Sequence, residues 1–166
     1  MTDAHVPAAG ADDARPRLLI ADDDPVVRAT LSAELTAFRI VALAQDATEA
    51  IELAERCRPD LALVDVDMPG GGGHEAVRRI SRSSPRTSLV ILSVDETRSD
   101  VVDLLNAGAV AYVRKGATAA ELTLVLREAL RAKDGAGATL ERALTAALRA
   151  RADLRGRQAA PAPGTP

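Results

Sequence analysis

The sequence predicts an α/β domain with a doubly wound parallel sheet, because five short apolar runs alternate with five helical stretches between residues 17 and 133. The clearest run is LALVD at residues 61–65, where four apolar residues lead into an acid, as in a strand buried on both faces. In such a sheet the crossovers are right-handed, and binding sites lie beyond the carboxyl ends of the strands. The residues that follow each apolar run are therefore the ones to examine for function.

The predicted strands are residues 18–21, 40–44, 61–65, 89–93 and 110–113. The predicted helices are residues 25–37, 46–56, 74–82, 97–107 and 118–133. Asp24 is placed to cap the first helix with Pro25 in its first position, and Gly108 ends the fourth helix. Capping-box spacings announce the second and fifth helices, at Asp46 with Glu49 and at Thr118 with Glu121.

Composition excludes several classes of protein. The 166 residues carry a net charge of −3, one cysteine and only two aromatic side chains, Phe38 and Tyr112. An internal disulfide is therefore excluded, no surplus of positive charge attracts nucleic acid, and platforms for stacking bases are missing. The sequence has neither an apolar run long enough to span a membrane nor the pattern of a secretory signal, so we expect a cytoplasmic protein without membrane contact.

Polar side chains follow four of the five predicted strands. They are Asp22 and Asp23 after the first strand, Asp65 and Asp67 after the third, Ser93 at the end of the fourth, and Lys115 just past the fifth. Clustered carboxylates raise one another's pKa values unless a cation lies among them, and hard oxygen ligands suit Mg²⁺. A carboxylate nucleophile, a divalent cation, a lysine and a hydroxyl are what phosphoryl transfer onto aspartate requires. We predict Asp65 as the acceptor and Asp23 as the principal metal ligand.

Four motifs in this order resemble the receiver domains of two-component response regulators, and the resemblance covers about residues 17–132. The motifs are DDDP at 22–25, LVDVDMPG at 63–70, ILS at 91–93 and GAVAYVRKG at 108–116. The resemblance implies a flavodoxin-like, five-stranded sheet in the order 2-1-3-4-5. It also implies phosphorylation by a sensor histidine kinase or a phosphotransfer protein, and a signalling domain that assists its own phosphorylation and dephosphorylation rather than an enzyme.

The resemblance also assigns a role to each site residue. It makes Asp65 the phosphoacceptor, and it makes Asp22, Asp23, Asp65 and the backbone carbonyl of Asp67 the ligands of Mg²⁺. It makes Ser93 and Lys115 the residues that grip the phosphoryl group. Tyr112 would be the ring that turns inward when Ser93 moves toward it. Such a local charge change biases a two-state surface toward a partner protein.

The sequence departs from the family's usual pattern at three places. Val94 follows Ser93 where alanine is usual, and we expect the bulkier side chain to narrow access to Asp65. Gly116 follows Lys115 where many members have proline, and the glycines at 70–73 are expected to make the loop after Asp65 flexible.

Two alternative functions remain. An interaction or scaffold domain that keeps the pocket but is not switched would follow if access past Val94 were too slow. A phosphatase of the haloacid-dehalogenase type also uses an aspartate followed two residues later by a second one, as in Asp65 and Asp67. In that family, however, the metal-binding acids come after the lysine, whereas here Asp22 and Asp23 come before Asp65, so the order favours the receiver.

The chain outside the α/β domain is expected to form three segments. They are a disordered tail over residues 1–15, a helical extension over 134–156 that follows the receiver domain of 16–133, and a disordered tail over 157–166. Residues 138–155 carry Leu140, Leu144 and Leu148 on one stripe, which indicates packing on the domain, dimerisation or partner docking. The arginines elsewhere on this helix leave a basic contact with nucleic acid or membrane as a further alternative. The segment is too short for a helix-turn-helix domain, so we expect output through protein partners, including a homodimer, and no direct DNA binding.

Overall fold

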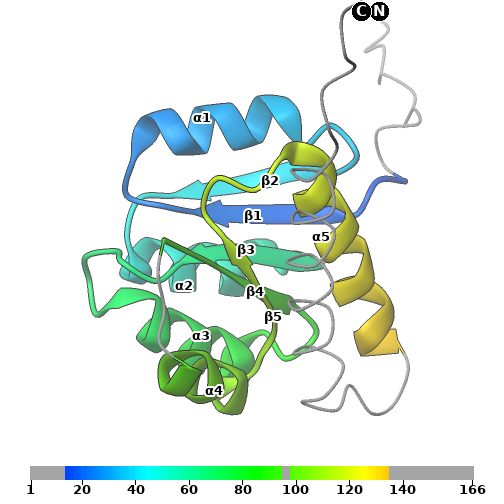
Figure 1. Cartoon of the computed structure of the whole chain (residues 1–166). Coiled ribbons are helices and arrows are strands. Elements are labelled where there is room, and N and C mark those ends of the chain that lie inside the picture. The colour runs from blue at the N-terminus through cyan, green and yellow to red at the C-terminus, as the bar shows by residue number, and fades with distance from the viewer. Residues whose placement is uncertain (1–13, 95–97, 135–166) are drawn as a thin grey trace, which may run out of the picture.

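The computed structural model describes residues 14–94 and 98–134, and its centre is a sheet of five parallel strands in the order β2-β1-β3-β4-β5 (Figure 1). The strands are β1 (Arg17–Ala21), β2 (Arg39–Ala44), β3 (Leu61–Asp65), β4 (Ser88–Ser93) and β5 (Ala109–Arg114). The strand order reverses beside β1, which pairs with both β2 and β3. The predicted doubly wound fold and strand order are confirmed.

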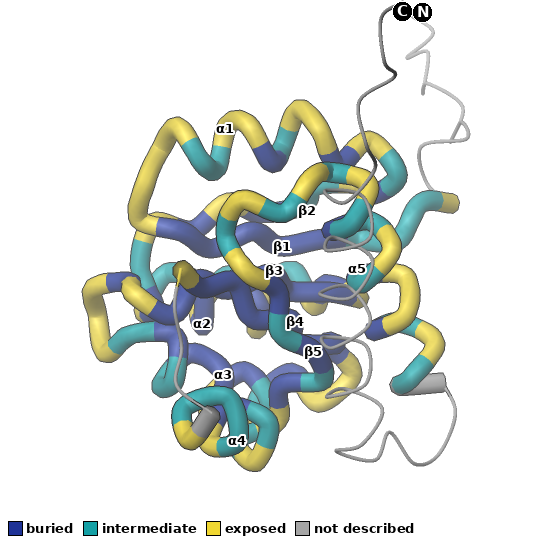
Figure 2. Tube along the Cα trace, in the orientation of Figure 1, coloured by how far each residue is buried: buried dark blue, intermediate teal, exposed yellow. Residues whose placement is uncertain are grey.

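Helices cover both faces of the sheet. They are α1 (Pro25–Glu34), α2 (Ala47–Cys57), α3 (Gly72–Ser83), α4 (Arg98–Ala107) and α5 (Ala119–Asp134). Alternate residues of β1 point to opposite faces: Leu19 packs in a cluster with side chains of α2, α3 and α4, while Leu18 packs with those of α1 and α5. The strands β1, β3 and β4 are consequently buried almost throughout, the edge strands β2 and β5 are partly exposed, and the outer faces of the helices are exposed (Figure 2).

Local capping residues start three of the helices where the sequence predicts. Asp24 caps α1 by accepting a 2.8 Å hydrogen bond from the amide of Val26. In α2 the Asp46 side chain accepts from the Glu49 amide, and the Glu49 carboxylate in turn accepts from the amide of Gln45. Thr118 and Glu121 exchange hydrogen bonds in the same manner before α5. These contacts confirm the capping predictions.

The first helix ends three residues earlier than predicted. The last helical residue is Glu34, and the amides of Thr36 and Phe38 donate to the carbonyls of Glu34 and Leu35 in a tight turn. This turn leaves Phe38 only 2% exposed, in the cluster under α1 and α5. Burial of the ring ends the helix, although residues 35–37 are compatible with a further turn.

The glycine run after β3 is a shaped turn that continues into α3. Gly70, Gly71 and Gly72 have φ values of 81°, 102° and 74°, which side chains rarely adopt. The helix therefore begins at Gly72 rather than at His74 as predicted. Gly73 packs so closely on the end of β3 that a Cβ atom there would lie 2.6 Å from the carbonyl oxygen of Asp65.

The predicted helical extension and the predicted tails lie almost entirely outside the described residues, and remain predictions. Thr97, the predicted first residue of α4, lies outside them as well, while Ala107 ends that helix as predicted. Within 14–94 and 98–134, none of the helices has both the length and the apolar character needed to cross a bilayer.

Candidate functional site

The predicted site residues meet at the carboxyl edge of the sheet. Asp65 is the last residue of β3 and Ser93 the last of β4, while Asp22 follows β1 and Lys115 follows β5. The side chains of Asp22, Asp65 and Ser93 belong to residues with 0% exposure, whereas Asp23 is exposed. Adjacent parallel strands deliver these groups from sequence positions far apart, which is the arrangement expected at a switch point of strand order.

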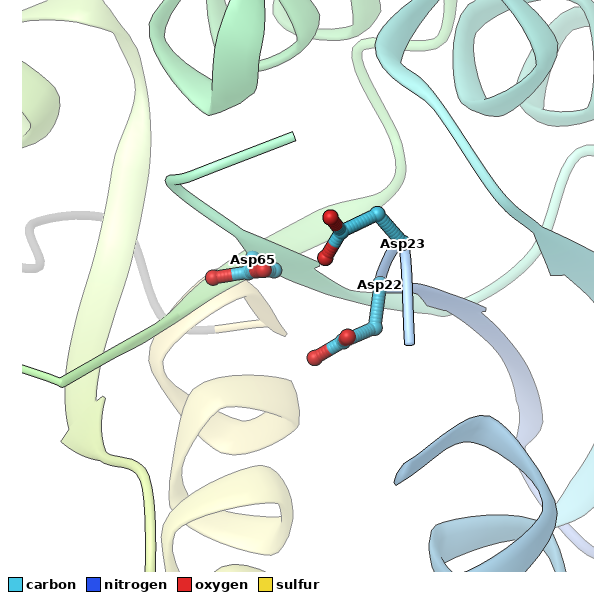
Figure 3. Close-up of side chains that lie close together, drawn as sticks. All are labelled: Asp22, Asp23 and Asp65. Atoms are coloured by element: carbon cyan, nitrogen blue, oxygen red, sulfur yellow. The ribbon is translucent and has the colours of Figure 1, made fainter. Parts of the chain in front are cut away.

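Three carboxylates form the acidic part of the site. Asp22, Asp23 and Asp65 each offer an oxygen, and these atoms lie within 4.8 Å of one another. Figure 3 shows the two acids that follow β1 beside the acid at the end of β3. At this separation three negative charges repel one another strongly, so the arrangement requires positive charge nearby.

Lys115 supplies one positive charge. Its Nζ atom donates a 2.8 Å hydrogen bond to Oδ2 of Asp65 and lies 2.9 Å from Oδ2 of Asp22. Its backbone amide donates to the carbonyl of Ser93 at 2.7 Å, which ties the residue after β5 to the end of β4. Lys115 thus links the carboxyl ends of β1, β3 and β4, which surround the site.

Burial and nearby charge shift the pKa values of Asp65 and Lys115. Desolvation raises the pKa of Asp65, and repulsion by Asp22 adds to the rise, while the hydrogen bond from Lys115 only partly opposes it. Desolvation alone would lower the pKa of Lys115, but the hydrogen bond to Asp65 and the attraction of the charges on Asp65 and Asp22 outweigh it and raise that pKa. The raised pKa of Asp65 indicates that one ammonium group compensates the buried acids incompletely.

The donor set fits a hard divalent cation. Oδ2 of Asp22 is buried and accepts no hydrogen bond of acceptable geometry, even though Lys115 lies close to it. The carboxylate of Asp23 has no hydrogen-bond or ion-pair partner in the part of the chain that the structure describes. Both residues therefore have carboxylate oxygens without a hydrogen bond. Mg²⁺ prefers such oxygen ligands, and water completes its coordination.

The remaining predicted residues lie around this cluster. The amide of Asp67 donates a 3.3 Å hydrogen bond to Oδ1 of Asp65, and its side chain is exposed. Tyr112 is half-buried on β5 and packs against the cluster of α2, α3 and α4. Val94 is 57% exposed directly after Ser93. The structure therefore brings the predicted acids, Ser93 and Lys115 to one edge of the sheet, whereas Tyr112 lies within β5. The carbonyl role of Asp67 and the movement of Tyr112 stay predictions.

Sequence reasoning missed Arg28. This residue of α1 donates a 2.5 Å hydrogen bond from Nη1 to the backbone carbonyl of Asp22. A signal was present, because a cation so near the N-terminus of a helix opposes the helix dipole and calls for a specific partner.

Comparison with known proteins agrees with this geometry. The protein family described as "Response regulator receiver domain" matches residues 18–127 of the chain. Response regulator GacA of Pseudomonas viridiflava is 37% identical over 114 residues, which are 67% of this chain and 53% of GacA. The nitrate/nitrite response regulator protein NarL of Escherichia coli (strain K12) is 32% identical over 139 residues, 80% of this chain and 63% of NarL. The chain thus spans only about half the length of GacA.

Solved structures share the fold. A two-component response regulator of the LuxR family from Aurantimonas sp. SI85-9A1 superimposes with a TM-score of 0.67 at 30% identity, over 70% of this chain and 86% of that one. A CheY-like receiver domain protein from Methanospirillum hungatei JF-1 gives a TM-score of 0.68 at 26% identity, over 74% and 99% of the two chains. Together with the acidic edge of the sheet, these matches show that the chain belongs to the response regulator receiver domain family, whose role in two-component signalling is to accept a phosphoryl group.

Proposed function

We propose that Asp65 accepts a phosphoryl group from a sensor histidine kinase or a phosphotransfer protein, and that the phosphorylated domain signals through contacts with a downstream protein. The observation that carries this proposal is the position of Lys115 Nζ, 2.8 Å from Asp65 and 2.9 Å from Asp22, beside a third carboxylate. This edge combines a buried nucleophile with a fixed cation and with oxygen ligands for a second one.

In the proposed step a carboxylate oxygen of Asp65 forms a bond to phosphorus as the bond from phosphorus to the donor's imidazole nitrogen breaks. The electron pair of the broken bond stays on that nitrogen, and an acyl phosphate remains on Asp65. Asp65 must be ionised to act. Burial raises the pKa of its carboxyl, and positive charge close to it favours the ionised form. Lys115 would then exchange its bond to Asp65 for one to the transferred group.

Asp22, Asp23, Asp65 and the carbonyl of Asp67 are the residues we propose to hold Mg²⁺. The bound ion would neutralise charge that spreads over the phosphoryl oxygens during transfer. Asp23 is the principal ligand in this proposal because its carboxylate is exposed and has no partner in the described part of the chain. The domain would assist its own phosphorylation and dephosphorylation without turning over a separate substrate.

Ser93 and Tyr112 are proposed to convert phosphorylation into a change of surface. Ser93 is fully buried at the end of β4, on the strand next to β3, so a hydroxyl there is suited to meet an oxygen of the new phosphoryl group. Tyr112 lies on the neighbouring strand β5, opposite Ile91. A shift of Ser93 toward the phosphate would let the half-buried ring turn inward and alter the surface around β5, where a downstream partner or a second copy of the chain would bind.

The test is the intact mass of the protein after incubation with Mg²⁺ and acetyl phosphate. We expect wild type to gain one phosphoryl group and Asp65→Asn to gain none. Asp60→Asn is the matched control, because Asp60 is an exposed acid at the opposite end of β3. Failure of wild type to gain mass from acetyl phosphate and also from a phosphorylated histidine kinase would overturn the proposal and favour an unswitched interaction domain. A gain that persists in Asp65→Asn would move the acceptor elsewhere.

A further inference from the structure

The side chain of Arg28 reaches back from α1 to the loop that carries two of the site's acids. Its Nη1 atom donates to the carbonyl oxygen of Asp22 at 2.5 Å, over a separation of six residues. Arg28 is half-buried, so the guanidinium is held in place rather than free in solvent. A charged donor to a backbone carbonyl is stronger than the usual neutral bond, and partial burial strengthens it further.

The bonded carbonyl belongs to the peptide that joins Asp22 to Asp23. Because a peptide unit is planar, fixing its oxygen also fixes the direction of the Asp23 amide. On one side the amide of Asp22 donates to the carbonyl of Ala44 at 3.1 Å, and on the other the amide of Asp24 donates to Oδ1 of Asp22 at 2.9 Å. With Arg28 as the third contact, the loop holds the two acidic side chains in a defined direction.

This third contact matters most for Asp23. Asp22 is buried and its carboxylate is bonded within the site, so several contacts hold it. The carboxylate of Asp23 is exposed and has no partner of its own in the described ranges, so only the backbone aims it at the cluster. The peptide plane that Arg28 fixes is the one between Asp22 and Asp23, directly before the Cα atom that carries the Asp23 side chain.

We propose that Arg28 is a positioning residue that fixes the Asp22–Asp23 peptide and thereby aims both carboxylates at the cation site. The metal-binding consequence rests on the proposed function, whereas the clamp on the loop does not. The alternative is that Arg28 acts only through its charge. The two ideas predict opposite signs, because removal of a nearby positive charge makes a site more attractive to Mg²⁺, while loss of alignment makes it weaker.

The experiment compares Arg28→Met with Arg28→Lys by calorimetric titration of the whole chain with Mg²⁺. Methionine keeps an unbranched stem without charge or donor, and we expect it to weaken Mg²⁺ binding about tenfold, as residues that orient metal ligands commonly do. Lysine restores a charged donor, and because the contact uses a single Nη1 bond, affinity should return to within about threefold of wild type. Arg56→Met, an equal charge change on the exposed last turn of α2, should leave affinity unchanged or slightly raised.

Amide hydrogen exchange of the metal-free protein tests the clamp itself. In Arg28→Met the amides of residues 22–24 should exchange several-fold faster, while those of β3 and β4 keep wild-type rates, which separates loosening of the loop from general destabilisation. Unchanged exchange in this loop would overturn the inference, and so would faster exchange combined with equal or tighter Mg²⁺ binding. If wild type itself failed to bind Mg²⁺, the metal part of the proposed function would fall, and the exchange rates alone would decide whether Arg28 clamps the loop.

Discussion

Lys115 and Asp65 are fifty residues apart in sequence, yet Nζ of the lysine lies 2.8 Å from Oδ2 of the aspartate at the carboxyl edge of the sheet. The same Nζ atom also lies 2.9 Å from Asp22, so one ammonium group is shared by two buried carboxylates. Among the described residues, this lysine is the cation that contacts both of these carboxylates directly. We therefore expect the stability of the metal-free domain and the proposed phosphorylation of Asp65 to depend on the same residue.

Removal of the lysine should destabilise the metal-free domain. Lys115→Met leaves Asp22 and Asp65 buried without their ion-pair partner, and loss of one member of a buried pair costs roughly 2–4 kcal/mol in the free energy of unfolding. Urea denaturation in EDTA measures this cost, with Arg127→Met on the exposed side of α5 as the control. Added Mg²⁺ should recover part of the loss, because a second cation then faces the acids. Equal stability of the two variants would contradict this description of the pair.

Neutralising Asp65 should stabilise the metal-free domain at neutral pH. The pKa of Asp65 is raised above 3.8, so the folded state holds the proton more tightly than the unfolded chain does. Stability is then greatest where Asp65 is protonated, and it decreases as the pH rises from about 4 through the folded-state pKa. Asp65→Asn cannot ionise and should escape this decrease.

The measurement is the free energy of unfolding of wild type and Asp65→Asn in EDTA between pH 4.5 and 7.5. The advantage of Asp65→Asn should grow as the pH rises and then level off. Glu52→Gln serves as the control, because Glu52 is an exposed acid on α2, away from the site. An advantage that shrinks toward neutral pH would show that the ion pair outweighs the burial of Asp65.

Mg²⁺ should stabilise wild type and should do so much less for Asp23→Asn. A ligand at a hundred times its dissociation constant adds about 2.7 kcal/mol to the free energy of unfolding. Because the Asp23 carboxylate has no partner in the described chain and lies among repelling acids, Asp23→Asn should be at least as stable as wild type in EDTA and should gain less stability from the metal. Thermal unfolding with and without Mg²⁺ makes the comparison, and Glu34→Gln, an exposed acid at the end of α1, controls for net charge. Equal Mg²⁺ stabilisation of both proteins would remove Asp23 from the ligand set.

Alanine substitutions at Gly73 and Gly116 should lower stability for different reasons. A Cβ on Gly73 would lie 2.6 Å from the carbonyl oxygen of Asp65 and from Cα of Val66, so the end of β3 must shift. At Gly116, φ is +93° but a Cβ would meet nothing within 4 Å. We expect Gly116→Ala to cost about 1 kcal/mol of backbone strain and to leave the phosphorylation rate near that of wild type.

Gly73→Ala should lose roughly 1–3 kcal/mol through overpacking, and phosphorylation by acetyl phosphate should slow more than stability alone explains, because Asp65 itself is displaced. Rates are compared at a temperature where both variants are fully folded by circular dichroism. A wild-type rate for folded Gly73→Ala would show that the strand end relaxes without moving the carboxylate.

Much of the fold was predictable from local pattern. The apolar runs located all five strands, and the caps at Asp24, Asp46 and Thr118 located three helix starts, because each signal involves residues within a few positions of one another. The end of α1 was predicted wrongly, since burial of Phe38 decides it and not helix propensity. The start of α3 was also misplaced, because a glycine run predicts conformational freedom and does not reveal close packing against β3.

By itself the sequence determined the parallel sheet, the edge at which the acids gather and the types of residue present there. These follow from the period of the apolar runs and from the rule that parallel strands end on the same side. Only the tertiary structure decided that Lys115 bridges Asp22 and Asp65, that Arg28 holds the carbonyl of Asp22, and that Gly73 lies against the carbonyl of Asp65. Each depends on distances of a few ångströms between separate elements, and such distances are set by packing across the whole domain rather than by spacing along the chain.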